Sequence, residues 1–194
     1  MSADFYCSFP LRPSRVHEVC GPGSAAFAIL AARMLTPILW VREALLPETL
    51  NPQALAAFLD PAGLLLAQTK SQVDSLAVAE EALRDGVVGF VVVEITRPLD
   101  LREGRRLQLA AGAGETTGLC LIPEGMGSNA AETRWHCSPV FDAEGHDSTL
   151  MRWQLIKNKS GTLGDWHVRW ESASYRLDVV SPPALRPGAA GPSD

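Results

Sequence analysis

Lysine is scarce in this chain of 194 residues, which contains only Lys70, Lys157 and Lys159. The 17 lysines and arginines are outnumbered by 22 aspartates and glutamates, so the formal net charge is -5 and the sequence pI is about 5.4. Because nucleic-acid binding needs a basic surface that displaces counterions, this balance argues against a dedicated nucleic-acid-binding protein. The arginines at 102, 105 and 106 indicate either a local basic patch or a solvated helix face.

Cysteine is also infrequent, and its positions match no CxxC metal-binding pattern. Three of the four cysteines lie in or beside predicted strands, so we expect them to be small buried apolar side chains in a reducing cytosol. The four histidines are scattered and show no Ser-His-Asp or metal-ligand spacing. We therefore expect no metal site and no catalytic group among them.

Long apolar runs are missing as well. The most apolar stretch, residues 25–41, is interrupted by Arg33 and Pro37 and is too short to span a bilayer. The N-terminus lacks a basic region followed by an apolar core and a cleavage site, so no secretory signal is evident. These observations predict a cytoplasmic protein that does not bind a membrane.

The sequence does contain an alternation of short apolar strands and helices. The run at 87–95 is the most hydrophobic and does not alternate, which is typical of a strand buried on both faces of a parallel sheet. We expect a helix that ends at Gly86 in a left-handed cap, and a later helix that begins with a capping box of Asp100 and Glu103. The pattern predicts an α/β domain with a mainly parallel sheet. Its strands are expected at 16–20, 38–42, 64–69, 87–95 and 118–122, and its main helices at 24–35, 72–84 and after Asp100.

The pattern changes at Thr133, after which strands follow one another without helices between them. We expect these strands to extend the sheet as antiparallel hairpins. Residues 1–15 are a short N-terminal extension and 16–180 form the domain. Residues 181–194, rich in proline, glycine and alanine, are expected to be a disordered tail.

The segment from Val16 to Leu30 has the outline of a phosphate-binding Walker A loop. Such a loop needs glycines whose backbone N–H groups hold phosphates, a lysine for the β and γ phosphates, and a hydroxyl group for Mg²⁺. Here the lysine position is Phe27, the hydroxyl position is Ala28, and the last glycine is Ala26. The loop is therefore degenerate, and we expect no nucleotide cofactor and no nucleotide hydrolysis. Its residues are Gly21, Pro22, Gly23, Ser24, Ala26, Phe27 and Ala28.

Two acidic residues lie on the predicted strands beside this loop. Glu94 ends a buried strand, where a Walker B acid would bind Mg²⁺ through water, but without a lysine or hydroxyl group in the loop we expect a vestigial or structural role. Glu18 faces either a pocket or a hydrogen-bonding partner at the strand end.

Several segments resemble RecA. They are H-E-V-C-G-P-G-S at 17–24, E-A-L-R-D-G-V-V-G-F-V-V-V-E-I at 81–95 and W-Q-L-I-K-N-K at 153–159. The closer resemblance is to the ImuA family, the RecA-like proteins of bacterial mutagenesis cassettes. It covers about residues 16–180 and is carried by E-E-A-L-R at 80–84, R-R-L-Q-L-A-A at 105–111, T-G-L at 117–119 and A-E-T-R-W at 131–135.

The resemblance implies a RecA-like core and a role in DNA-damage-induced (SOS) translesion synthesis. ImuA proteins act with ImuB, a catalytically inactive relative of Y-family polymerases, and with an error-prone replicative-type polymerase; contact with RecA is also implied. The extension before Val16 is too short for the oligomerising helix and strand of RecA, so a RecA-like filament is not expected. The connections at 96–100 and 123–132 are short where RecA has long DNA-holding loops, so we expect no strong DNA binding.

Partner contacts are predicted in the late strands. Lys157 and Lys159 share a strand face by their period of two, and in RecA the matching lysines reach ATP across the filament interface. That face could meet an acidic partner or a RecA-type subunit, or it could be a lysine-protected edge strand. Trp153, Arg134 and Trp135 are residue types enriched at interaction hot spots, with core packing as the alternative for the rings.

Three functions follow from these patterns. The first is a non-enzymatic protein that binds RecA, ImuB or both, and so reaches the error-prone polymerase indirectly. The second is a DNA-dependent ATPase whose lysine comes from outside the loop. The third, from the label that links some relatives to SulA, is an inhibitor of the cell-division protein FtsZ.

Overall fold

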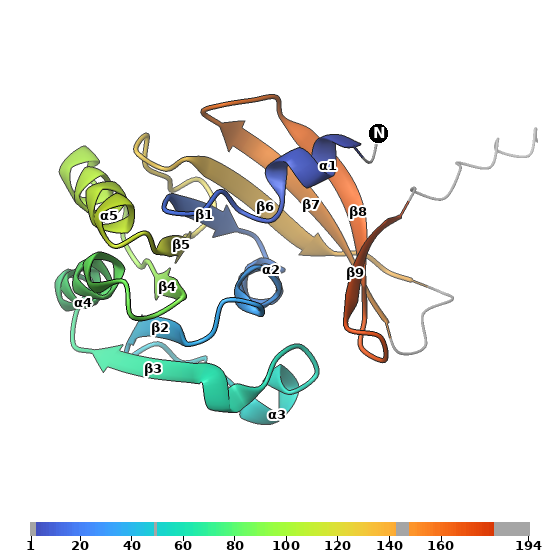
Figure 1. Ribbon diagram of the computed structural model, residues 1–194, viewed down its shortest axis with the longest axis horizontal. Helices are drawn as coiled ribbons and strands as arrows, with labels where there is room; N and C mark the ends of the chain where they lie inside the picture. The colour runs from blue at the N-terminus through green and yellow to red at the C-terminus, as the bar shows by residue number, and fades with distance from the viewer. Residues whose placement is uncertain (1–2, 49, 143–147, 181–194) are drawn as a thin grey trace, which may run out of the picture.

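The computed structural model describes residues 3–48, 50–142 and 148–180, which form a nine-stranded sheet flanked by helices (Figure 1). The helices are α1 (Ala3–Ser8), α2 (Ser24–Ala32), α3 (Pro52–Leu55), α4 (Gln72–Asp85) and α5 (Leu101–Ala113), with a 3-10 turn, η1, at Pro61–Gly63. The strands are β1 (Val16–Cys20), β2 (Ile38–Glu43), β3 (Leu64–Thr69), β4 (Phe90–Glu94), β5 (Thr117–Leu121), β6 (Thr133–Pro139), β7 (Ser148–Asn158), β8 (Gly164–Glu171) and β9 (Arg176–Val180). The tail predicted at 181–194 lies outside the described residues.

The strands lie in the order β3-β2-β4-β5-β1-β6-β7-β8-β9. Neighbours from β3 to β6 are parallel, whereas β7, β8 and β9 are antiparallel to the strands beside them. The predicted α/β fold, with a mainly parallel sheet extended by C-terminal antiparallel strands, is therefore confirmed. One detail differs: the sequence predicts antiparallel strands from Thr133 onward, but β6 pairs parallel with β1 and the direction reverses only at β7.

The parallel pairing of β6 requires an unusual connection. Both β5 and β6 lie beside β1 and run parallel to it, so the chain must return from the end of β5 to the start of β6 across β1. Residues 122–132, here called the crossover segment, make this return without a helix. The crossover segment packs closely against α5. A Cβ added to Gly104 on this helix would lie only 2.5 Å from Ser128 Oγ.

Local signals set the ends of α4 and α5 as the sequence predicts. Ser71 accepts a hydrogen bond from the Asp74 N–H at the start of α4, and Gly86 ends the helix with a left-handed φ of 74°. Asp100 and Glu103 form the reciprocal capping box at the start of α5. The strand in the 87–95 run, β4, begins only at Phe90; Gly89 before it packs against the Leu35 backbone and donates to the Pro37 carbonyl oxygen.

The face of the sheet beside α1 and α2 is packed by an aromatic cluster. Its members come from the N-terminal extension, α2 and strands β6 to β8: Phe5, Phe9, Phe27, Trp135, Trp153 and Trp166. The Phe27 ring centroid lies 4.6 Å from that of Trp153 and 5.3 Å from that of Trp135. Because each buried ring removes roughly 150–250 Å² from water, this cluster is a large part of what joins the antiparallel strands to α2.

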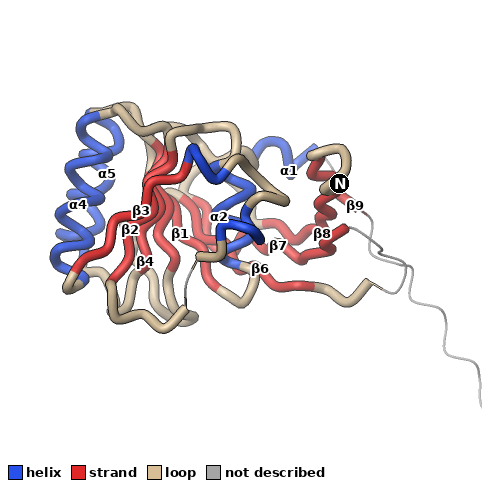
Figure 2. The backbone as a smooth tube through the Cα atoms, turned by 90° about the horizontal axis from the view of Figure 1, so that it is seen from below, coloured by secondary structure: helices blue, strands red, loops and turns tan. Residues whose placement is uncertain are grey.

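The opposite face of the sheet carries α4 and α5 over its parallel half (Figure 2). Glu80 on α4 accepts from Arg84 of the same helix and from Arg106 on α5, so one carboxylate ties the two helices together. The apolar core beneath them contains side chains of β1, β4 and β5. Strands β1 and β4 are therefore buried on both faces, as the non-alternating sequence of β4 predicts.

The strand cysteines behave as the sequence predicts. Cys20, Cys120 and Cys137 are buried free thiols, whereas Cys7 is exposed. Burial raises the pKa of the Cys120 and Cys137 thiols, so both stay protonated and act as small apolar side chains. In the described part of the chain, no helix is both long and apolar enough to cross a membrane.

A chain of hydrogen bonds connects the aromatic cluster to His17, which is buried on β1. Trp135 Nε1 donates to Thr133 Oγ1 at 3.0 Å, and this hydroxyl lies 2.7 Å from His17 Nδ1. His17 Nε2 lies 2.9 Å from the Arg12 carbonyl oxygen. Because that carbonyl can only accept, Nε2 carries the proton of the neutral ring and Nδ1 accepts from Thr133. Burial lowers the pKa of His17 to about 4.

We expect the free energy of unfolding to decrease as the pH falls from about 7 towards 4. Unfolded His17 binds a proton near pH 6.5 and folded His17 only near 4, so the unfolded state holds more protons between these values. The shift corresponds to about 3 kcal/mol. Urea unfolding of the wild type and of His17→Gln, at several pH values in this window, measures the effect. The stability difference between the two proteins should shrink as the pH falls; a constant difference would contradict a neutral buried His17.

Candidate functional site

Residues 21–28, predicted from the sequence to be a degenerate phosphate loop, pack directly against the backbone of β6. The Gly23 N–H donates to the Cys137 carbonyl oxygen at 2.8 Å. Gly21 has a φ of 90°, and a Cβ added there would lie 2.5 Å from the same oxygen. The two glycines therefore allow contact between the loop and a strand. The Gly23 amide, one of those that a phosphate would need, already has a protein acceptor.

The residue at the lysine position points into the core. Phe27 and Ala28 are both 0% exposed, and Phe27 contacts three other rings of the aromatic cluster. Helix α2 begins at Ser24, with Gly23 at the N-cap and no side-chain cap. At this position a lysine would have to place its ammonium group among tryptophan and phenylalanine rings, at a large desolvation cost.

Glu94 ends β4 at the position of a Walker B acid and is bound by the neighbouring strand. Its Oε1 accepts from Trp40 Nε1 at 2.7 Å, and its Oε2 lies 3.3 Å from Arg42 Nη2. The Arg42 side chain is only 4% exposed, so the ion pair is largely buried. These contacts support the structural role expected for Glu94, because both of its oxygens have partners on β2.

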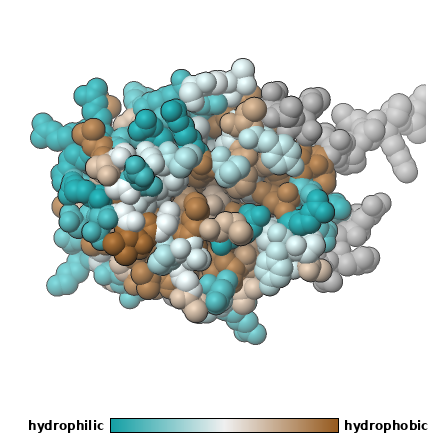
Figure 3. Space-filling model, viewed as in Figure 1, coloured by the Kyte–Doolittle hydropathy of each residue, from teal (hydrophilic) through white to brown (hydrophobic). Residues whose placement is uncertain are grey.

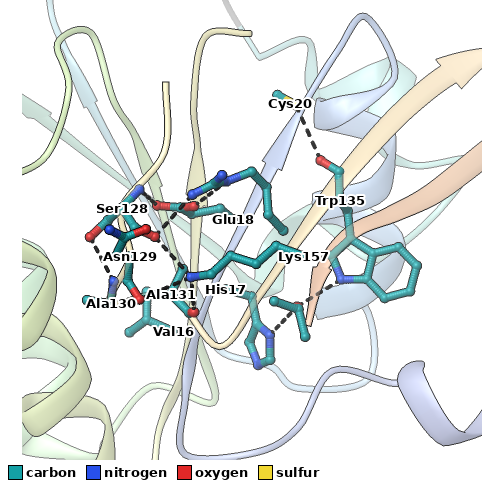
Figure 4. A network of polar contacts seen from close by, with 12 residues as sticks. Val16, His17, Glu18, Cys20, Ser128, Asn129, Ala130, Ala131, Trp135 and Lys157 are labelled. Atoms are coloured by element: carbon teal, nitrogen blue, oxygen red, sulfur yellow. Dashed lines mark hydrogen bonds and ion pairs between the residues drawn. The ribbon is translucent and has the colours of Figure 1, made fainter. Parts of the chain in front are cut away.

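Glu18 lies beneath the crossover segment and holds it to the sheet (Figure 4). One carboxylate oxygen accepts from the Ser128 N–H and the other from Arg134 Nε, each at 2.7 Å. Arg134 Nη2 also donates to the Ser128 carbonyl oxygen at 3.0 Å. Of the two alternatives for Glu18, the structure agrees with the hydrogen-bonded one, because both carboxylate oxygens have donors and the side chain is 1% exposed.

Lys157 and Lys159 bind the same segment from the end of β7. Lys157 Nζ donates to the carbonyl oxygens of Ser128, Asn129 and Ala131, and Lys159 Nζ donates to that of Ala130 at 2.6 Å. The lysines therefore share a face, as their spacing predicts, but that face meets the chain's own backbone. Burial lowers the pKa of Lys157.

A β-bulge is what turns Lys157 towards Glu18. Arg134 pairs with Lys157 and the next residue, Trp135, pairs with Leu155, so Ile156 has no partner on β6. The extra residue reverses the alternation, since without it Lys157 would share the core face of Leu155.

The remaining predicted contact residues divide between the two faces of the sheet. Arg134 joins the lysines at the crossover segment, with 21% of its side chain exposed. Trp135 and Trp153 lie on the opposite face and are both 0% exposed, so their rings have no surface to offer a partner. Core packing, the alternative for these rings, agrees with this burial.

Exposed apolar side chains lie elsewhere, on parts of the surface that the sequence analysis did not single out. The edge strand β3 carries Leu65 and Leu66, each 50% exposed, and contains no charged residue. Apolar surface gathers where β3 lies (Figure 3). On α5, Leu101 and Leu109 are 49% and 74% exposed. Spacing alone could have found this pair, because residues eight apart lie within one face of a helix, about 80° apart around its axis.

Comparison of the chain with protein-family models gives no match, and comparison with curated proteins gives none either. Function is therefore inferred from the residues and their geometry. Within the described residues, no group of three or more histidines, cysteines, aspartates and glutamates is placed to hold a metal ion.

Restoring the missing loop residues should unfold the protein rather than create a nucleotide site. We expect Phe27→Lys with Ala28→Thr to lower the free energy of unfolding by about 3–5 kcal/mol or more, because the ring leaves a cavity and the ammonium enters the aromatic cluster. Urea unfolding measures this, with Ala25→Gly, at an exposed position of α2, as the control. A stable double variant with a melting temperature that rises on addition of Mg²⁺ and ATP would contradict the assignment.

Lys157 should stabilise the crossover segment, whereas Lys70, which follows the edge strand β3, should not. We expect Lys157→Met to speed hydrogen exchange at residues 128–131 and to lower the free energy of unfolding by about 1.5–3 kcal/mol, because three backbone carbonyl groups lose a charged donor. Lys70→Met is the matched control. Equal exchange in the two variants would show that the lysine does not hold the segment.

Proposed function

We propose that this protein is a non-enzymatic accessory protein of DNA-damage-induced translesion synthesis in the cytoplasm. It has a degenerate RecA-like core and binds RecA, ImuB or both, and it meets the error-prone polymerase only through them. The resemblance of residues 16–180 to ImuA supports this proposal. The strand order is consistent with it, because a parallel block followed by antiparallel strands is what a RecA-like core would have.

The position of Phe27 carries the non-enzymatic part of the proposal. Phosphoryl transfer depends on groups that position and neutralise the phosphates, above all the loop lysine and Mg²⁺. The lysine position is occupied by a fully buried ring, and the Gly23 amide is bonded to β6. Both features oppose nucleotide binding independently of each other.

The ATPase alternative requires a lysine from another part of the chain. Lys157 and Lys159 donate to the crossover segment. Lys70 follows β3, which is four strand spacings from β1, or about 19 Å across the sheet. The contacts of Lys157 and Lys159 and the position of Lys70 therefore oppose the ATPase alternative.

Partner binding does not need the missing chemistry, because a fold can retain its packing surfaces after it has lost its catalytic groups. The buried tryptophans of the late strands do not supply the contact. The exposed leucines of α5, Leu101 and Leu109, are among the apolar residues available for it.

Complex formation without nucleotide tests the proposal. Size-exclusion chromatography with light scattering of the protein alone, with RecA and with ImuB should give a stable complex with at least one of them. In parallel, Mg²⁺ and ATP should leave the melting temperature unchanged, whereas a ligand at 100 times its Kd would stabilise the protein by about 2.7 kcal/mol.

Three results would contradict the proposal. Absence of a complex with both proteins would remove the translesion role, and binding to FtsZ with loss of its assembly would favour a SulA-like inhibitor. Stabilisation by Mg²⁺ and ATP would restore the ATPase alternative.

A further inference from the structure

A groove runs between α5 and the crossover segment, on the face of the sheet opposite the aromatic cluster. Its volume is about 490 Å³, within the range of roughly 300–1,000 Å³ typical of ligand pockets. Helix α5 contributes Leu101, Arg105 and Leu109, and Ala130 and Lys159 lie on the other side. Leu101, Arg105 and Leu109 recur every four residues, so they form one stripe along the helix.

The walls of the groove are fixed by contacts already within the protein. Gln108, which also lines it, donates from Nε2 to the Val16 carbonyl oxygen and accepts from the Val16 N–H. The crossover segment is held by Glu18 and Lys157, and the absence of a Cβ at Gly104 lets it pack against α5. A preformed groove binds a partner without the cost of ordering its walls.

The charge of the groove has one sign. Its two charged lining residues, Arg105 and Lys159, are both cationic. Within the described residues, no carboxylate pairs with Arg105, which is exposed. An occupant that matches this surface is apolar along its centre and acidic along its sides.

We propose that this groove binds an acidic amphipathic helix of a partner protein. Leucine-type side chains of the helix would lie between Leu101 and Leu109, and its carboxylates would pair with Arg105 and with the exposed side of Lys159. A helix in a groove is a common mode of peptide recognition. Nucleic acid fits less well, because the groove offers no aromatic ring for base stacking and its exposed leucines would remain in water.

This inference rests on the proposed function in that the protein acts by binding another protein, and it adds the surface and the chemistry of the bound segment. Leu109 and Arg105 are both exposed, so substitutions there should not disturb the fold. Leu66→Glu, at a half-exposed leucine on β3, is the matched control for Leu109→Glu.

A labelled synthetic peptide tests the groove without a partner protein. The probe is a helix of about 18 residues with leucine at i, i+4 and i+7 and glutamate on the flanks. Fluorescence anisotropy should show binding that weakens about tenfold or more in Leu109→Glu and in Arg105→Glu, weakens with salt, and is unchanged in Leu66→Glu. A peptide with lysine in place of glutamate should not bind.

Several outcomes would overturn the proposal. The acidic and the lysine peptides could bind equally well. Binding of the acidic peptide could be lost in Leu66→Glu but kept in Leu109→Glu. A single-stranded oligonucleotide could bind the groove in place of the acidic peptide. Self-association of the protein that Leu109→Glu abolishes would make a second copy the occupant. If the peptide binds as expected but neither RecA nor ImuB forms a complex, the groove stands and the proposed function fails.

Discussion

The burial of Phe27 among tryptophan and phenylalanine rings is the contact on which the rest of the structure depends. It joins α2 to the antiparallel strands and to the N-terminal extension, three parts of the chain that are distant in sequence. The ring occupies the position where a phosphate loop has its lysine. The same side chain therefore stabilises the core and removes the cation that nucleotide chemistry needs.

A second group of residues likewise stabilises the fold. Glu18, Arg134 and Lys157 are charged residues on the neighbouring strands β1, β6 and β7, and all three bind the crossover segment. Largely buried charges are tolerated only when they are paired and hydrogen-bonded, and these meet backbone amide and carbonyl groups as well as each other. These charged side chains suggest a binding site in the sequence, but in the structure they hold the crossover segment in place. The crossover segment in turn forms one wall of the groove beside α5.

Much of the fold could be predicted because its signals are local. The apolar runs of β1 and β3 have the predicted ends, and the capping box of α5 lies within four residues. The contacts that decide the site are not local. Periodicity cannot reveal the bulge at Ile156 that turns Lys157 to the crossover segment, nor the burial of Trp153 beneath residues of the N-terminal extension. Those depend on strand pairing between segments that are far apart in the chain.

Hydrogen–deuterium exchange of the whole protein, measured alone, with Mg²⁺ and ATP, and with RecA or ImuB, tests the central claim most directly. If the chain is a binding protein whose nucleotide position is filled, ATP should leave exchange at 21–28 unchanged, while a partner should slow exchange on the exposed surface of the domain. Protection of 21–28 by ATP, with no change on adding either partner, would contradict it.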